Sequence, residues 1–234
     1  MSGGEAGSGQ SPEGQLEPRA RESLEKVLAL LRSERASVSS ITEPARAWKV
    51  HVADSLSGLS VDELAAAGAI ADIGSGAGFP GLALAAALPD ASVDLIESVA
   101  RKCEFMRRAA AAGKIVNARV VNERAETWAA APPPDGGREA YDAVTVRAVG
   151  RLSTLAELAS PLLREGGLLV AWKGRRSADE DAELAAAAQR LAMEALEVLA
   201  VGPYDGSSHR HLHIVSMSCP TPEGLPRRPG MAKK

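Results

Sequence analysis

Hydrophobic residues in the first part of the chain recur at the spacing of amphipathic helices. One helix is predicted by apolar positions three or four residues apart, at Ala20, Leu24, Val27, Leu28 and Leu31. Thr42-Glu43-Pro44 predicts a second helix start, because proline suits the first helical turn. Ser60-Val61-Asp62-Glu63 has the spacing of a capping box and predicts a short third helix ending at Gly68. We therefore expect a helical cap over residues 16–68, preceded by a disordered leader at 1–15.

The hydrophobic pattern changes after Gly68, where short apolar runs alternate with longer helical segments. Strands are predicted at 69–73, 92–96, 118–121, 141–146, 168–172, 196–201 and 211–217. Helices are predicted between them, ending at 88 for the first and then at 99–112, 152–163 and 178–195. Such alternation is typical of an α/β fold with a mostly parallel sheet. The last two strands are too close for an intervening helix, so an antiparallel hairpin should end the sheet.

Domain boundaries follow from this pattern. Residues 69–218 are expected to form the ligand-binding α/β domain, and residues 219–234 a basic C-terminal tail. No apolar run is long enough to cross a bilayer, and the N-terminus lacks the basic and apolar regions of a signal peptide. Cys103 and Cys219 are too few for a disulfide framework or a zinc site. We expect a cytoplasmic protein with no membrane partner and no metal.

The charge balance narrows the kind of nucleic-acid binding to consider. The 234 residues include 27 basic and 30 acidic side chains, for a formal net charge of −3, and only 3% of residues are aromatic. This composition excludes a general, charge-driven nucleic-acid binder and disfavours binding through many aromatic platforms. A local basic patch on an otherwise acidic protein stays compatible with RNA binding.

A glycine-rich loop follows the first predicted strand. Residues 72–81 read DIGSGAGFPG, and Phe79 stands where the dinucleotide pattern G-x-G-x-x-G requires glycine. The loop instead resembles motif I of class I S-adenosylmethionine (SAM) methyltransferases, which implies cofactor contacts from Gly74, Ser75, Gly76, Gly78 and Phe79. Glu97 ends the second predicted strand, where this fold places an acid for the ribose hydroxyls. The other interpretation is a glycine turn that only packs a helix on a strand.

Several further motifs occur in a family-specific order. They are His51-Val52-Ala53-Asp54-Ser55-Leu56, Gly74–Gly81, Leu95-Ile96-Glu97-Ser98, Val146-Arg147-Ala148-Val149, Trp172-Lys173-Gly174 and Pro226-Arg227-Arg228-Pro229-Gly230. From Leu16 onward the chain resembles the small-subunit ribosomal RNA methyltransferase G family, also called glucose-inhibited division protein B. The resemblance implies a Rossmann-like class I methyltransferase that methylates N7 of the guanine at position 527 of 16S rRNA with SAM. It also implies cofactor contacts at Gly74, Phe79, Ala125, Glu126 and Arg147.

Two departures from the family pattern concern the cap and the tail. The usual Asn-Leu-Thr is not evident near Val38-Ser39-Ser40, and Met231 stands where Thr-Pro is common. Both lie away from the glycine loop, so they leave the expected cofactor site unchanged.

Guanine N7 chemistry agrees with the side chains available. N7 carries an in-plane lone pair and no proton, so in-line attack on the methyl group needs positioning rather than a general base. No catalytic base is therefore assigned, and Arg147 and Lys173 could position the substrate from the ends of their strands. His51 and Asp54 lie one helical turn apart and are expected to join the cap to the domain.

RNA contacts are expected from basic residues on one helix and near the chain's end. The candidates are Arg101 and Lys102 on that helix, Arg175 and Arg176 after the fifth predicted strand, and Arg227 and Arg228 in the tail. For the helix, an ordinary solvated face is the alternative. The expected partner is 16S rRNA or a small-subunit particle. The protein is expected to be a monomer. Two other functions stay open: a SAM-dependent methyltransferase of small molecules, and a SAM-binding regulator without catalysis.

Overall fold

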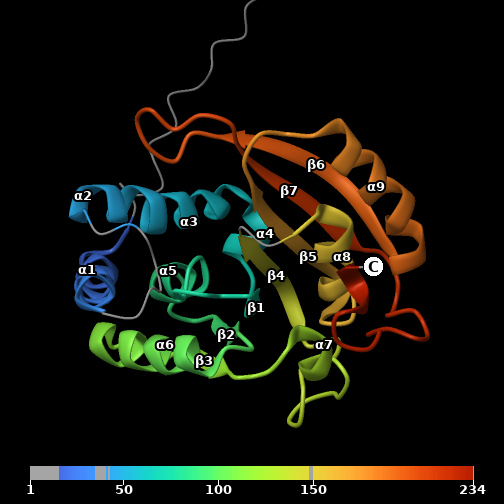
Figure 1. Cartoon of the computed structure of the whole chain (residues 1–234), viewed down its shortest axis with the longest axis horizontal. Coiled ribbons are helices and arrows are strands. Elements are labelled where there is room, and N and C mark those ends of the chain that lie inside the picture. Colours follow the sequence, from blue (N-terminus) through green and yellow to red (C-terminus); the bar gives the residue numbers. More distant parts are fainter. Residues whose placement is uncertain (1–15, 35–40, 42, 148–149, 234) are drawn as a thin grey trace, which may run out of the picture.

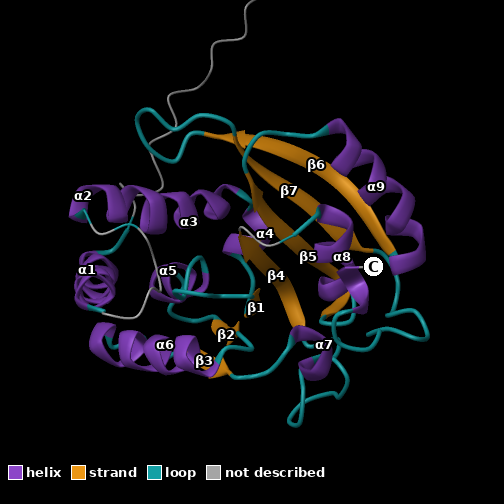
Figure 2. Ribbon diagram, viewed as in Figure 1, coloured by secondary structure: helices purple, strands orange, loops and turns teal. Residues whose placement is uncertain are grey.

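The computed structural model describes residues 16–34, 41, 43–147 and 150–233, so the expected leader lies outside the described residues. Its seven strands form one sheet in the order β3-β2-β1-β4-β5-β7-β6, with helices on both faces (Figures 1 and 2). The strands are β1 (Ala69–Ile73), β2 (Ser92–Ile96), β3 (Ala118–Val121), β4 (Tyr141–Arg147), β5 (Leu163–Lys173), β6 (Met193–Val201) and β7 (Arg210–Met217). Only the pairs that include β7 are antiparallel among these strands. The predicted fold class is confirmed.

The helices of the described chain divide into an N-terminal group and the helices that connect strands. The first group is α1 (Pro18–Ser33), α2 (Pro44–Ala47), the π-helix η2 (Trp48–Ala53), α3 (Asp54–Leu56), the 3-10 turn η3 (Ser57–Ser60) and α4 (Asp62–Ala65). The second is α5 (Gly81–Ala87), α6 (Ala100–Gly113), α7 (Ala125–Trp128), α8 (Leu152–Ala159), α9 (Ala178–Ala188) and the 3-10 turns η4 (Gln189–Leu191) and η5 (Met231–Lys233). Within the described residues, no helix combines the length and apolarity needed to cross a membrane.

Alternation along the strands explains the two cores. In β5, Leu168, Val170 and Trp172 join the core beneath α1, α5 and α6, whereas Leu169 and Ala171 join the core beneath α8 and α9. Successive side chains of a strand point to opposite faces, so a strand with helices on both sides must be apolar at nearly every position. This is why residues 168–172 of β5 form a continuous hydrophobic run.

The N-terminal helices pack on the first core face. Leu24 and Val27 of α1 are fully buried, and α1 packs against α5 and α6 (Figure 1). Glu43 caps α2 by accepting hydrogen bonds from the backbone N–H groups of Ala45 and Arg46. The predicted capping box at residue 60 is wrong: Ser60 Oγ donates to the carbonyl of Ser57 instead, so it caps the preceding turn.

Two predicted helix ends are also wrong. Gly166 and Gly167 do not follow a helix ending at Leu163, because α8 ends at Ala159 and both glycines lie within β5. A Cβ at Gly167 would stand 3.0 Å from the carbonyl oxygens of Tyr141 and Asp142, where the pairing of β4 and β5 shifts register. Glycine therefore serves a close backbone approach at a bulge. The helix predicted at 178–195 ends at Ala188, because Met193 already belongs to β6.

The order of the strands locates the ligand-binding edge. β1 lies between β2 and β4: the chain runs outward from β1 through β2 to β3, and then returns to the other side of β1 as β4. In open parallel sheets such a switch point opens a crevice at the carboxyl ends of the strands. The glycine loop after β1, Glu97 after β2 and Arg147 at the end of β4 meet there.

Candidate functional site

The loop between β1 and α5 is shaped by its glycines. Gly74, Gly76 and Gly78 have φ angles of 66°, 59° and 91°, a backbone region that side chains disfavour. A Cβ on Gly78 would lie 2.4 Å from Leu82, whereas a Cβ on Gly76 would meet only the Gly74 carbonyl at 3.7 Å. Gly78 is therefore required by packing, and Gly76 presents open backbone beside the edge of the sheet.

Asp72, the polar residue of β1, is hydrogen-bonded to the end of this loop. Its carboxylate is fully buried and accepts hydrogen bonds from the Gly81 backbone N–H at 3.1 Å and from Thr145 Oγ1 at 3.2 Å. Burial raises the pKa of Asp72 to about 6, and these hydrogen bonds oppose the rise. The carboxylate therefore links β1, β4 and the start of α5 at the switch point of the sheet.

Glu97 connects the end of β2 to the glycine loop. Its carboxylate accepts from the Gly76 N–H at 3.2 Å and from the Val99 N–H at 2.9 Å, and Lys102 Nζ lies 3.5 Å from Oε2. The residue is 6% exposed. These bonds fix the carboxylate at the strand end while leaving lone pairs that a pair of hydroxyl groups could share.

A hollow of about 140 Å³ opens between these strand ends and the helices of the second face. Gly74 and Glu97 line one side, and Ala125 and Glu126, at the start of α7, line another. The remaining wall comes from Thr154 and Leu158 of α8 and from Ala232 near the end of the chain. Figure 1 shows this C-terminal segment beside α8. Glycine backbone, a fixed carboxylate and apolar helix surface thus surround one concave site.

Arg147 is held by the N-terminal helices rather than directed into this hollow. Its guanidinium donates to the Val50 carbonyl at 3.1 Å, to Ser55 Oγ at 3.1 Å and to the Asp54 carboxylate at 3.0 Å. The Arg147 side chain is 14% exposed and that of Asp54 is 5% exposed. The expected role of Asp54 in joining cap and domain is confirmed, and Arg147 is its partner in that joint.

Two aromatic residues of the expected site are also packed against the cap. Phe79 stacks on His51, with ring centroids 5.1 Å apart, and only 5% of Phe79 is exposed. Burial and the neighbouring Arg147 lower the pKa of His51 to about 4, so its imidazole is neutral at neutral pH. Trp172 is also buried, and its Nε1 donates to the Asp54 carbonyl at 2.7 Å.

The expected RNA-contact residues differ in how they are held. Arg176 pairs with Asp181, and Lys173, which was expected to position the substrate and is not one of the six, is bonded to the Gly150 carbonyl and to Glu180. Ion pairs also engage Lys102 with Glu97 and Arg227 with Glu157. All of the six except Lys102 are exposed, and Arg101, Arg175 and Arg228 form no ion pair with another described residue. Three of the six candidates are therefore already paired with a carboxylate of the protein.

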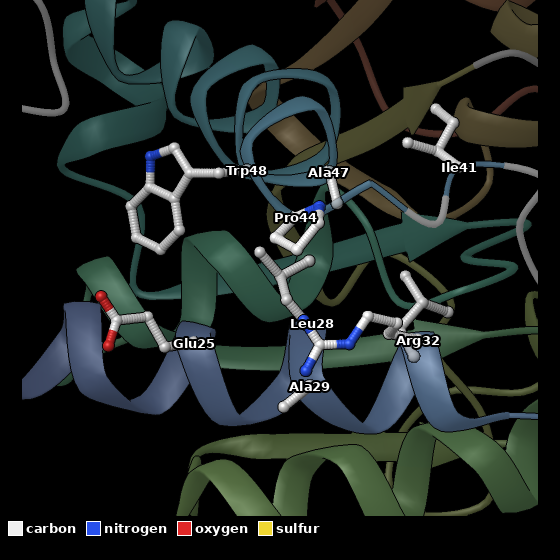
Figure 3. Close-up of a pocket in the computed structure, with 9 residues that line it drawn as sticks. Glu25, Leu28, Ala29, Arg32, Ile41, Pro44, Ala47 and Trp48 are labelled. Carbon is white, nitrogen blue, oxygen red and sulfur yellow. The ribbon is translucent and has the colours of Figure 1, made fainter.

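A second concavity belongs to the N-terminal helices. It has a volume of about 250 Å³ between α1 and α2 and is lined mostly by apolar groups, including Leu28, Pro44, Ala47 and Trp48 (Figure 3). Glu25 and Arg32 stand at its edges in the same view. No residue of the strand ends lines it, so it is separate from the site around Glu97.

Sequence reasoning missed the contributions of Thr154, Leu158 and Ala232 to the hollow. Gly230 donates its backbone N–H to Glu126 at 2.7 Å, although the two residues are 104 positions apart in the chain. No periodicity or motif marks these residues, because the tertiary fold alone brings the C-terminal segment to α7 and α8. The one available signal was the motif at residues 226–230, which ends at Gly230, two positions before Ala232.

Comparisons with known proteins agree in one family. The family model for rRNA small subunit methyltransferase G matches residues 22–212. A ribosomal RNA small subunit methyltransferase G from Desulfitobacterium hafniense is 36% identical over 202 residues, covering 86% of this chain and 82% of that protein. The protein of that name from Chloroflexus aggregans is 39% identical over 201 residues, covering 85% and 82%.

Solved structures support the fold. A predicted O-methyltransferase from Agrobacterium tumefaciens has a TM-score of 0.55 and 27% identity, over 70% of this chain and 79% of that one. A SAM-dependent O-methyltransferase from Thermotoga maritima has a TM-score of 0.52 and 14% identity, over 84% and 73%. At the latter identity the likeness concerns the fold alone.

Proposed function

Because the chain belongs to the rRNA small subunit methyltransferase G family, we propose that it transfers a methyl group from SAM to N7 of guanine 527 in 16S rRNA. A member of this family is a SAM-dependent methyltransferase. The single observation that carries the assignment of the site is the Glu97 carboxylate, fixed beside the Gly76 backbone at the carboxyl ends of β1 and β2.

The residues around the hollow fit the chemistry of the cofactor. SAM supplies an electrophilic methyl group on a sulfonium. The ribose diol would share the Glu97 carboxylate, and the adenine would lie toward Ala125 and Glu126. The methionine part would follow the loop at Gly74, Ser75, Gly76, Gly78 and Phe79. The open backbone at Gly76 leaves room for such a group, since a Cβ there would meet no heavy atom closer than 3.7 Å.

Transfer of a methyl group to N7 requires alignment of the two reactants and no removal of a proton. Because N7 bears a lone pair and no proton, catalysis consists of holding the acceptor in line with the methyl–sulfur bond. His51 is neutral and stacked on Phe79, which suits a wall of the site and not a base. Arg147 and Lys173 position the acceptor in this scheme. Arg147 acts through the cap that it binds at Asp54 and Ser55.

The substrate partner that we propose is 16S rRNA or a small-subunit particle in the bacterial cytoplasm. Arg101, Arg175 and Arg228 are exposed and could meet phosphates directly. Lys102, Arg176 and Arg227 would first have to exchange a protein carboxylate for a phosphate. We propose that the protein acts as a monomer, with RNA binding that weakens as salt increases.

Methyl incorporation tests this function. Purified protein is incubated with tritiated SAM and either 16S rRNA, 30S subunits or 23S rRNA as the control RNA, and the labelled base is mapped. We expect label at N7 of guanine 527 in a small-subunit substrate and none in 23S rRNA. Clear SAM binding without incorporation into any rRNA would overturn the proposed reaction. It would favour a small-molecule methyltransferase or a non-catalytic SAM-binding regulator.

A further inference from the structure

Taking the proposed cofactor site as given, we propose that residues 230–232 form one wall of the pocket for the adenosine part of SAM. They make this C-terminal segment a part of the cofactor site. The RNA contacts expected from the basic tail would then be only one of its roles. Three sets of contacts support this proposal.

The segment that leads to the pocket is anchored to the domain. Arg227 donates two hydrogen bonds of 2.5 Å to the Glu157 carboxylate on α8. Arg138 Nη1 donates to the Leu225 carbonyl at 2.7 Å. The Glu157 side chain is 15% exposed, so a paired fork of this geometry is partly shielded from water. These two anchors fix the direction in which the chain continues past Pro229.

At the pocket itself, both ends of the short segment are bonded. The Gly230 N–H donates to Glu126 Oε1 at 2.7 Å, and Thr154 Oγ1 donates to the Ala232 carbonyl at 3.1 Å. Gly230 has a φ of 85°, which a residue with a side chain would adopt only under strain. The backbone therefore turns at Gly230 and then runs from α7 toward α8.

The third observation is the place of Ala232. It lines the same hollow as Gly74, Glu97, Ala125 and Glu126. The Glu126 side chain is 10% exposed, and one of its oxygens is used by Gly230. Glu126 is thus a positioning residue that holds the wall. The backbone around Ala125 and the segment at Ala232 are the surfaces that would enclose the planar adenine ring.

Binding of S-adenosylhomocysteine and of adenosine, measured by calorimetry, tests the wall. The test variant ends at Pro229, and the matched control is Glu223→Gln, at an exposed residue of the same tail outside the segment. We expect the shortened chain to bind both ligands about tenfold more weakly, from lost hydrogen-bonded contacts, and the control to bind as the full chain does. An equal loss for both ligands is expected because they share the adenosine part. Unchanged binding, or a loss for S-adenosylhomocysteine alone, would overturn the proposal.

A second variant covers the case in which the shortened chain fails to fold. Thr154→Val keeps the side-chain shape but removes the bond to Ala232, and Thr154→Ser keeps the bond. We expect about a threefold rise in Kd for the valine variant and none for serine, with unchanged circular dichroism. Equal Kd values for both variants and the full chain would refute a role of the wall.

The coupling between ligand binding and the C-terminal segment can be measured on the full chain, without any variant. If the segment closes the pocket, saturating S-adenosylhomocysteine must stabilise the segment, since the coupling between two events is reciprocal. Trypsin cleavage after Arg227, followed by mass spectrometry, should slow about tenfold with ligand. A ligand-independent cleavage rate would contradict the wall. Failure of the full chain to bind S-adenosylhomocysteine at all would instead refute the proposed cofactor site, so the two failures are distinguishable.

Discussion

The buried carboxylate of Asp72 should make the stability of the domain depend on pH. We consider the substitution Asp72→Asn. The side-chain amide oxygen of asparagine can still accept from the Gly81 N–H, and its NH2 group can donate to Thr145 Oγ1. The substitution removes the titration and keeps the shape. The residue is fully buried, so solvent screens its ionisation very little.

The sign follows from the direction of the shift. Burial raises the pKa of Asp72 from its ordinary value of 3.8 to about 6, so the folded protein holds this proton more tightly than the unfolded chain does. The free energy of unfolding therefore falls as pH rises from about 4 to about 6, and the loss is complete above that range. The shift corresponds to about 3 kcal/mol in total. About 1.4 kcal/mol of it should appear between pH 5 and pH 8.

Urea unfolding at about pH 5 and about pH 8 measures this difference. We expect Asp72→Asn to gain about 1.4 kcal/mol of stability relative to the unsubstituted protein on going to the higher pH. Other titrating groups cancel in that comparison. The control is Asp90→Asn, at an exposed carboxylate, which should show no such gain. The same stability difference between Asp72→Asn and the unsubstituted protein at both pH values would refute the reasoning.

Two further substitutions test the loop and its partner carboxylate. Gly81→Ala would place a Cβ 2.2 Å from Leu95 Cδ2 and should cost about 2 kcal/mol in urea unfolding. Gly202→Ala, with no heavy atom within 4 Å, is the control, and an equal effect of both would contradict the packing argument. Glu97→Ala should weaken SAM binding in calorimetry about tenfold or more, since it removes a charged hydrogen-bond acceptor. Glu104→Ala, at an exposed carboxylate on α6, should leave the affinity unchanged, and equal affinities for all three proteins would refute the ribose assignment.

The edge of the sheet could be predicted from the sequence because the physics that sets it is local. Apolar runs separated by helical segments require parallel strands, and parallel strands bring their carboxyl ends to one side. That rule places Gly74, Glu97 and Arg147 at one edge before any coordinates are known. It does not say where each side chain is bonded, and Arg147 shows the difference. Its partners, Val50, Asp54 and Ser55, lie nearly a hundred residues earlier in the chain.

Two of the wrong sequence predictions concern residue types that are common in more than one kind of local structure. A glycine pair after a helical pattern commonly ends the helix, yet Gly166 and Gly167 lie in β5. The neighbouring backbone leaves no room for a side chain at Gly167, and Gly166 has a φ of 79°, which side chains disfavour. Ser60 fits a capping box by spacing but is used by the carbonyl three residues before it. At Gly167 a tertiary contact overrides the local preference, and at Ser60 one local hydrogen bond replaces another.

The contact between Glu126 and Gly230 has a consequence for the order in which the pocket is built. During synthesis, the glycine loop, Glu97 and α7 leave the ribosome well before residues 230–232. The sheet can therefore fold around a pocket that still lacks one wall. Until the C-terminal segment reaches α7 and α8, the nascent protein has an open pocket and, on our proposal, a weaker hold on its cofactor.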